Sequence, residues 1–129
     1  MKLGYTILYV DDVPATLAAW EAAFGLTRRF LHESDEYAEL ETGSTTLSFA
    51  GRTFGQGHFE QPEVRAMFEG EPKLYEIGLV TDDVPGAYAK AVAAGMTVVR
   101  EPVTQPWGQQ VGWVRDDNGI LVEIASPMD

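Results

Sequence analysis

The side chains able to do chemistry in this sequence are few in kind. There is no cysteine, which excludes thiolate nucleophiles, cysteine metal ligands and disulfide bonds. Only two histidines occur, His32 and His58, and the sequence shows no nucleophile–histidine pairing and no phosphate-binding glycine loop. We expect both histidines to be ordinary polar or partly buried residues. The chemistry that remains is that of carboxylates, hydroxyl groups and aromatic rings.

Trp107 is one candidate for contact with a ligand, because proline and glycine flank it in the sequence Pro106-Trp107-Gly108. These neighbours favour a turn of fixed geometry. A tryptophan ring held on such a turn could stack on a planar molecule. The alternative interpretation is that the ring fills space between a helix and a sheet.

The acidic residues outnumber the basic ones by 20 to 9, which gives a net charge of −11. Such a surface repels phosphate backbones, so we expect no nucleic acid partner. It raises the local concentration of cationic ligands, or it serves only to keep the protein in solution. No secretory signal and no apolar run long enough for a membrane span are found, and we therefore expect a cytoplasmic protein with no membrane partner.

An internal repeat organises the chain. The tetrapeptide Asp-Asp-Val-Pro at residues 11–14 recurs at residues 82–85, a shift of 71 residues (82 minus 11). At the same shift, Ala18, Ala22 and Ala23 match Ala89, Ala93 and Ala94. A repeat of this kind predicts two similar structural units.

Each repeat reads as a strand, a helix and three further strands. In each copy an aspartate before Val-Pro is suited to cap the helix, and a glycine, Gly25 or Gly95, follows its end. The first helix carries an apolar stripe that we expect in the core, formed by Val13, Leu17, Trp20 and Phe24. The predicted strands are residues 5–10, 26–31, 37–41 and 45–50 in the first half, and residues 76–80, 96–99, 110–115 and 120–125 in the second.

We expect a single domain spanning residues 1–129, with a first module at about 1–50, a connector at 51–72 and a second module at about 73–129. The connector contains several aromatic residues, including Phe54 and Phe59. Long aromatic connectors are often functional, which predicts a loop that folds over a pocket. Residues 63–69 could form a short helix within it.

The repeat resembles the vicinal oxygen chelate superfamily, which includes glyoxalase I, extradiol dioxygenases, fosfomycin-resistance proteins and bleomycin-resistance proteins. In character it is most similar to the bleomycin-resistance group. The stretches that carry the resemblance are residues 7–12, 24–26, 106–108 and 114–123. The resemblance implies an α+β fold in which two βαβββ modules form a half-open barrel around a cleft.

Metal-dependent members of this superfamily place four ligands, His, Glu or Gln, on the first and last strands of the two modules. The resemblance puts these positions here at Tyr5, Ser48, Glu76 and Glu123, and a two-residue slip would put Thr46 in place of Ser48. Only two of the four are carboxylates, whereas zinc or nickel usually takes at least three good protein ligands. We therefore expect no transition metal and no other cofactor, although a hard cation could bind weakly between the glutamates.

If the fold is as implied, Glu76 and Glu123 face one cleft. Either arginine or tyrosine side chains pair with them, with Arg115 and Tyr5 as candidates, or they receive a positively charged or amide-rich ligand. A role as general acid or base is a further alternative. Trp113 is a candidate ligand contact, and the sequence leaves open whether it and Phe49 point inward or outward.

The leading hypothesis is a homodimer that binds and sequesters a small cationic or aromatic molecule without metal. The candidate ligand-binding residues are Tyr5, Ser48, Phe54, Phe59, Glu76, Trp107, Trp113 and Glu123. The alternatives are a glyoxalase- or dioxygenase-like enzyme with an atypical metal site, and a metal-free isomerase or lyase that uses Glu76 or Glu123 as its base.

Overall fold

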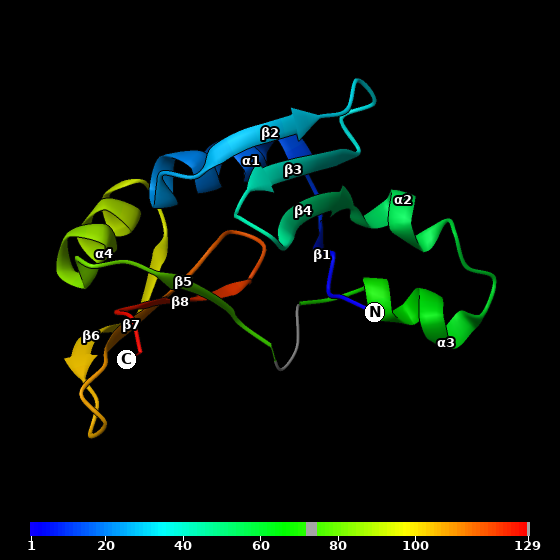
Figure 1. The fold of residues 1–129 in the computed structure, drawn as a ribbon. Coiled ribbons are helices and arrows are strands. Elements are labelled where there is room, and N and C mark those ends of the chain that lie inside the picture. The colour runs from blue at the N-terminus through cyan, green and yellow to red at the C-terminus, as the bar shows by residue number, and fades with distance from the viewer. Residues whose placement is uncertain (72–74, 129) are drawn as a thin grey trace. The chain divides into compact units, whose positions relative to one another are not determined.

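The computed structural model describes residues 1–71 and 75–128. The chain divides into two compact units, Met1–Gly70 and Glu71–Asp129. Each unit contains one four-stranded sheet and one long helix (Figure 1). None of the helices in the described residues is long and apolar enough to span a membrane.

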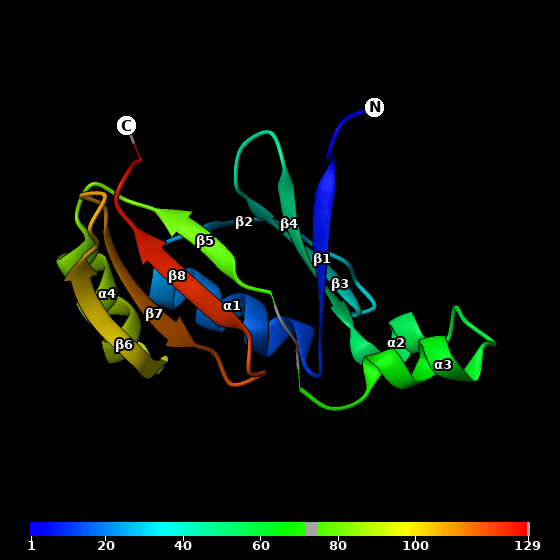
Figure 2. The same ribbon diagram turned by 90° about the horizontal axis from the view of Figure 1, so that it is seen from below.

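The first unit begins with a strand, a helix and three strands. These are β1 (Tyr5–Val10), α1 (Val13–Phe24), β2 (Thr27–Leu31), β3 (Tyr37–Glu41) and β4 (Thr46–Gly51). The strand order in the sheet is β1-β4-β3-β2. Strand β1 runs parallel to β4, and the other neighbours are antiparallel. The sheet is therefore unclosed, with β1 and β2 at its edges (Figure 2).

The connector adds helical turns to the first unit. They are α2 (Arg52–Gln56), α3 (Pro62–Arg65) and the short 3₁₀ helix η1 (Ala66–Phe68). The predicted loop is thus largely helical, and the short helix expected at residues 63–69 is split between α3 and η1. Pro62 accounts for the start of α3, because proline is favoured in the first turn of a helix.

The second unit repeats the topology of the first. It contains β5 (Ile77–Val80), α4 (Val84–Ala93), β6 (Thr97–Thr104), β7 (Gln110–Arg115) and β8 (Leu121–Ala125). The strand order is β5-β8-β7-β6, with β5 parallel to β8. The predicted α+β class with two βαβββ modules is confirmed. Strand β6 is longer than predicted, because the segment after Val99 stays paired with β7 across two irregularities.

The two long helices begin as the sequence predicts. The Asp12 side chain accepts a hydrogen bond from the Ala15 amide, and the Asp83 side chain accepts one from the Gly86 amide, both at 3.0 Å. These bonds satisfy amides that have no partner within a helix. Gly25 ends α1 in the left-handed region, with φ of 66°, where glycine carries no steric cost.

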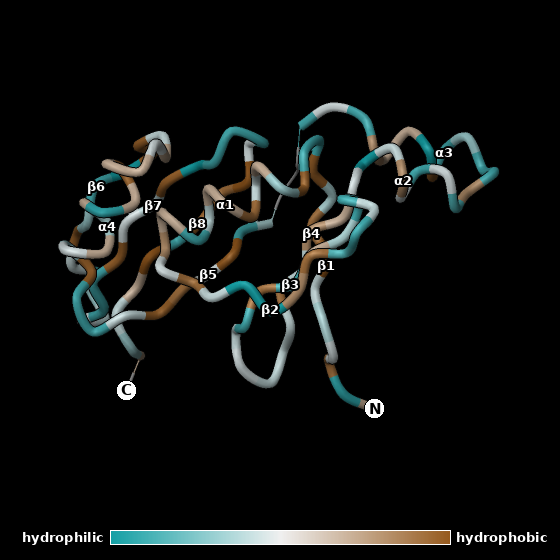
Figure 3. The backbone as a smooth tube through the Cα atoms, turned by 90° about the horizontal axis from the view of Figure 1, so that it is seen from above, coloured by the Kyte–Doolittle hydropathy of each residue, from teal (hydrophilic) through white to brown (hydrophobic). Residues whose placement is uncertain are grey.

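The core of the first unit lies between α1 and one face of the sheet. Trp20 is fully buried, and its ring meets those of Phe24 and Phe49 edge to face at centroid distances of 5.1 and 5.0 Å. Phe49 therefore points to the helix side, which settles the orientation that the sequence left open. Hydrophobic and hydrophilic stretches follow one another along the chain in both sheets (Figure 3). The alternation is regular in β3, where Ala38 and Leu40 are buried and their neighbours are more exposed, as expected where only one face packs on a helix.

Candidate functional site

The sheet of the second unit has one face covered by α4 and one face that α4 leaves open. Tyr88 of α4 lies against Gly112, its ring 3.0 Å from the position that a Cβ atom would take there. Because side chains alternate along β7, Trp113 points to the open face. Trp113 pairs with Glu123 of β8, and cross-strand partners share a face. The open face thus brings together two of the predicted site residues.

Glu76, just before β5, joins them. The Trp113 indole Nε1 donates a hydrogen bond to Glu76 Oε2 at 2.9 Å. Burial, hydrogen bonding with Glu76 and the charge of Glu76 together raise the pKa of the Glu123 carboxyl above its ordinary value. The structure therefore places both predicted glutamates and Trp113 in one polar cluster, which we call the Glu76–Glu123 cluster.

The partners of these carboxylates differ from those considered from the sequence. In the part of the chain that the structure describes, neither Glu76 nor Glu123 forms an ion pair with an arginine or lysine. Arg115 lies at the exposed end of β7 and, among the described residues, forms no ion pair with either glutamate. Tyr5 belongs to the first unit. The indole N–H of Trp113 donates to Glu76 instead, a role that the sequence did not indicate.

Arg100 of β6 is a further neighbour that sequence reasoning missed. It is paired with Trp113 in the strand register, and its guanidinium carbon lies 5.9 Å from the centre of the Trp113 ring. This distance is within the range of cation–π attraction. The ring of Trp113 thus has a cation over it and a carboxylate at its N–H edge.

Trp107 lies in the turn between β6 and β7. The turn is closed by a hydrogen bond from the Gly108 amide to the Gln105 carbonyl at 2.8 Å, and Gly108 has φ of 94°. The Trp107 side chain is 64% exposed, so the alternative interpretation as a plug between helix and sheet is wrong. Its Nε1 donates to the Gln109 side chain at 3.0 Å, and no hydrogen bond among the described residues joins it to the Glu76–Glu123 cluster.

The strand register in the first unit decides between Ser48 and Thr46. Ser48 pairs with Ile7 and Glu123 pairs with Gly78, and the partners Ile7 and Gly78 are related by the repeat shift of 71 residues (78 minus 7). Ser48 is therefore the counterpart of Glu123. Tyr5, which pairs with Thr46, lies at the start of β1 and is 62% exposed.

Ser48 is fully buried and belongs to a hydrogen-bonded chain on the open face of its sheet. The Tyr37 hydroxyl donates to Glu39 Oε2 at 2.7 Å and lies 3.0 Å from Ser48 Oγ. Since the single Tyr37 proton goes to the carboxylate, Ser48 must donate to Tyr37. Burial and the bond to Glu39 raise the pKa of the Tyr37 hydroxyl. The polar alternation of residues 37, 39 and 41 was the signal that could have indicated Tyr37 and Glu39.

Arg29 completes the polar surface of this face. Its Nε and Nη2 atoms donate to the two oxygens of Glu41 at 2.7 and 2.9 Å, and its Nη1 donates to Thr46 at 2.8 Å. One side chain thereby ties β2, β3 and β4 together. Thr46 and Glu41 are thus engaged in a cross-strand contact within the sheet.

The connector aromatics pack within the first unit. Phe59 and Tyr9 both lie against Phe68, at centroid distances of 5.7 and 4.7 Å. A Cβ atom on Gly55 would collide with the Tyr9 ring, so glycine is required for this close approach. Phe54 is half exposed in α2 and packs edge to face on His58. The predicted residues Phe54 and Phe59 therefore pack within the first unit, whereas the Glu76–Glu123 cluster belongs to the second unit.

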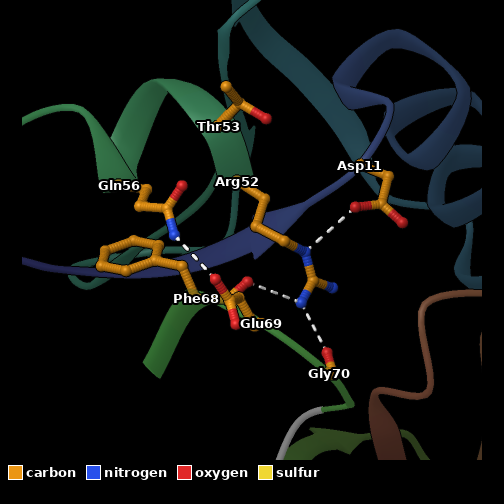
Figure 4. Close-up of a pocket in the computed structure, with 7 residues that line it drawn as sticks. All are labelled: Asp11, Arg52, Thr53, Gln56, Phe68, Glu69 and Gly70. Carbon is orange, nitrogen blue, oxygen red and sulfur yellow. Dashed lines mark hydrogen bonds and ion pairs between the residues drawn. The ribbon is translucent and has the colours of Figure 1, made fainter. Parts of the chain in front are cut away.

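A pocket of about 470 Å³ lies beside this segment, at the end of β1 (Figure 4). Arg52 crosses it: Nε donates to Asp11 Oδ1 at 3.0 Å, and Nη1 donates to the carbonyls of Phe68 and Gly70. Gln56 donates to the Arg65 carbonyl at 2.9 Å. Neither Phe54 nor Phe59 lines this pocket, and the contacts of Arg52 and Gln56 mainly hold the connector in place.

The four positions at which the resemblance expects metal ligands do not suit a transition metal. They carry a phenol, a hydroxyl and two carboxylates; the Ser48 hydroxyl is bonded to Tyr37, and Glu76 accepts from Trp113. Across residues 1–71 and 75–128, no three His, Asp or Glu side chains cluster in a way that could hold a metal ion. Transition metals in proteins normally take three or more such ligands, and this donor set does not provide them.

The histidines have local partners. His32 follows β2 directly, and its Nδ1 is 2.8 Å from the Ser34 hydroxyl. His58 Nδ1 is 3.1 Å from the Phe54 carbonyl. Each ring thus hydrogen-bonds to a residue that is near it in the sequence.

Comparisons with known proteins identify the fold and the family. The glyoxalase/bleomycin-resistance protein/dioxygenase superfamily matches residues 2–124. A glyoxalase/bleomycin-resistance/dioxygenase family enzyme from Burkholderia phytofirmans is 18% identical, with a TM-score of 0.82 over 99% of this chain and 100% of its own. A glyoxalase-related enzyme from Fulvimarina pelagi is 19% identical, with a TM-score of 0.82 over 98% of this chain and 88% of its own.

TioX from Micromonospora sp. ML1 is also similar, at 19% identity and a TM-score of 0.76 over 99% of this chain and 100% of its own. No curated protein matches the sequence. Likeness at this level of identity shows the fold alone, and activity has to be argued from the site. The family match over nearly the whole chain, with the repeated βαβββ topology, establishes that the chain belongs to the glyoxalase/bleomycin-resistance/dioxygenase superfamily.

Proposed function

We propose that this protein binds a small molecule that carries a positive charge and a flat ring, on the open face of the second sheet. One observation carries the proposal: Glu76 and Glu123 lie together beside Trp113, with no ion pair to a described arginine or lysine. Adjacent carboxylates without a counterion favour the arrival of a cation. A ring beside Trp113 would gain on the order of 1 kcal/mol beyond its area burial.

The net charge supports the same ligand class. A protein with a charge of −11 raises the local concentration of cations and speeds their association. We propose that the ligand is held without a metal and without conversion, as in sequestration by bleomycin-resistance proteins. Trp107, on its exposed turn, is proposed as a second aromatic contact.

The test uses two probes of matched shape: proflavine, a planar cation at neutral pH, and acridine, its largely uncharged parent ring. Binding is measured by titration calorimetry at low and high salt. The double variant Glu76→Gln/Glu123→Gln should weaken proflavine binding by on the order of tenfold and flatten its salt dependence, because the attraction of exposed charges is screened by salt. Trp107→Ala should weaken binding with the salt dependence unchanged.

Glu101→Gln is the matched control for this experiment. Glu101 lies in β6, and its charge acts on the hydroxyl of Tyr88 in α4, so the variant removes one negative charge on the helix side, half of the change made by the double variant. It should bind proflavine as the wild type does. Equal loss of binding in Glu101→Gln, or no binding of proflavine to the wild type, contradicts the proposal.

The raised pKa of Glu123 favours a second candidate function, a metal-free general acid or base. Such groups work best when their pKa is near the pH of the reaction. The two functions separate when the bound compound is recovered and analysed by mass spectrometry. An unchanged compound supports sequestration, whereas a product that is lost in Glu123→Gln establishes an enzyme.

We also propose that the chain forms a homodimer. Its two sheets each leave two edge strands, β1 and β2 in one and β5 and β6 in the other, and such edges invite pairing with another chain. Sedimentation at micromolar concentration should show a dimer, and a monomer alone would contradict this.

A further inference from the structure

Charges of opposite sign follow one another across the open face of the second sheet. Arg100 on β6 pairs with Trp113 on β7, and Trp113 pairs with Glu123 on β8. Glu76 accepts the indole N–H of Trp113. From β6 to β8 the order of groups on this face is therefore a cation, an aromatic ring and a pair of carboxylates.

These opposite charges do not neutralise each other. Within the described parts of the chain, Arg100 forms no ion pair with Glu76 or Glu123, and its guanidinium lies over the Trp113 ring instead. The register of β6 shifts on both sides of Arg100. Such irregularities re-aim a side chain, and they are common next to functional sites. Here the irregularities flank Arg100, whose guanidinium lies over the Trp113 ring and does not pair with Glu76 or Glu123.

We infer that this face recognises a dipolar aromatic molecule, with its cationic group at Glu76 and Glu123 and its anionic group at Arg100. The inference rests on the proposed function and specifies its ligand further. Neighbouring strands are about 4.8 Å apart, so the backbones of Arg100 and Glu123, two strands apart, are separated by roughly 10 Å. A ligand whose opposite charges are at the two ends of a ring matches this order of groups.

The probes are three benzene compounds: phenylguanidine, which is a cation, benzoate, which is an anion, and 4-guanidinobenzoate, which carries both charges. A carboxylate added to a ligand should in general be repelled by a protein with a net charge of −11. At this face we expect the opposite: 4-guanidinobenzoate should bind on the order of tenfold more tightly than phenylguanidine, through a charge-assisted contact with Arg100. Benzoate alone should bind most weakly.

Arg100→Gln separates the two ends of the ligand. This variant should bind 4-guanidinobenzoate no better than phenylguanidine, while its affinity for phenylguanidine is unchanged or higher. Lys90→Gln is the control, because it removes one positive charge from exposed α4 on the other side of the sheet. Lys90→Gln should still bind 4-guanidinobenzoate on the order of tenfold more tightly than phenylguanidine. Circular dichroism and the melting temperature confirm that both variants are folded.

The outcomes distinguish the inference from the proposed function. If phenylguanidine binds and depends on the two glutamates, but the added carboxylate gives no gain or the same gain in Arg100→Gln, the inference is wrong and the proposed function stands. If phenylguanidine binding is unaffected by Glu76→Gln/Glu123→Gln, the proposed function is wrong. If the wild type binds neither guanidinium compound, both are wrong.

Discussion

The indole of Trp113 and the carboxylate of Glu76 are joined by a hydrogen bond of 2.9 Å. Trp113 lies on β7 and Glu76 just before β5, and β8 lies between these two strands. The bond therefore spans β8 and fixes a carboxylate next to Glu123.

Trp113→Phe should remove this bond while keeping an aromatic ring on the face. Glu76 is exposed and can hydrate when the donor is lost, so the free energy of unfolding should fall by about 0.5–1.5 kcal/mol. Urea unfolding followed by circular dichroism measures the change. Trp107→Phe is the control, because it removes an indole hydrogen bond to Gln109 in an exposed turn. It should lower the free energy of unfolding by less than Trp113→Phe does. Equal losses in the two variants would contradict a specific role for the Trp113 bond.

The stability of the protein should depend on the protonation of Glu123. Burial, then hydrogen bonding with Glu76, then the charge of Glu76 raise the folded pKa of this carboxyl above its unfolded value. Between the two pKa values the folded state binds more protons, so the free energy of unfolding decreases as pH rises. The contribution is fully present below the unfolded pKa and is lost as pH passes through the folded pKa.

Urea unfolding at a series of pH values from 4 upward (about 0.5 unit apart) measures this dependence. Glu123→Gln cannot ionise and should lack this part of the slope. Glu101→Gln, with the same charge change on the helix side, should keep it. If the free energy of unfolding of Glu123→Gln decreased with pH as steeply as that of the wild type, a group other than Glu123 would be responsible for the dependence.

The repeat made the fold predictable. The two Asp-Val-Pro segments fixed the starts of α1 and α4, because the side chains of Asp12 and Asp83 cap free amides in the first turn. Apolar alternation then placed seven of the eight strands within one or two residues of their observed ends, whereas β6 continues to Thr104, five residues beyond its predicted end. These are local effects, and a single sequence contains the information for them.

The candidate site was only partly predictable, because its geometry depends on contacts between strands. The resemblance supplied Glu76 and Glu123, and the structure adds that Trp113 is their neighbour and Arg100 lies over its ring. The register that pairs Arg100 with Trp113 passes through irregularities in β6. No pattern of alternation in the sequence indicates where such an irregularity falls.

Trp20 should be a main source of stability in the first unit. It is fully buried between Phe24 and Phe49, and replacing a buried aromatic residue by alanine usually costs about 3–5 kcal/mol. Trp20→Ala should therefore unfold at much lower urea concentration, and Trp20→Phe should lose less because it retains part of the packing. A loss below about 1 kcal/mol in Trp20→Ala would show that the site relaxes around the cavity.

Arg52 should hold the connector against the first unit. It links Asp11 at the end of β1 to the carbonyls of Phe68 and Gly70, and its side chain is only 21% exposed (Figure 4). Arg52→Gln removes the charge and the fork of donors, so residues 58–71 should open locally more often.

Chymotrypsin provides the measurement for Arg52, because Phe54, Phe59 and Phe68 are sites at which it can cut the connector. Cleavage there should be several-fold faster in Arg52→Gln under native conditions, since proteolysis follows the population of the open form. Arg52→Lys keeps the charge but cannot reach Asp11 and the two carbonyls together, so it should be intermediate. Arg28→Gln removes an exposed ion pair with Glu21 and serves as the control, with cleavage at the wild-type rate. Equal cleavage rates in all four proteins would mean that the packing of Phe68 against Tyr9 and Phe59 is sufficient to hold the connector without Arg52.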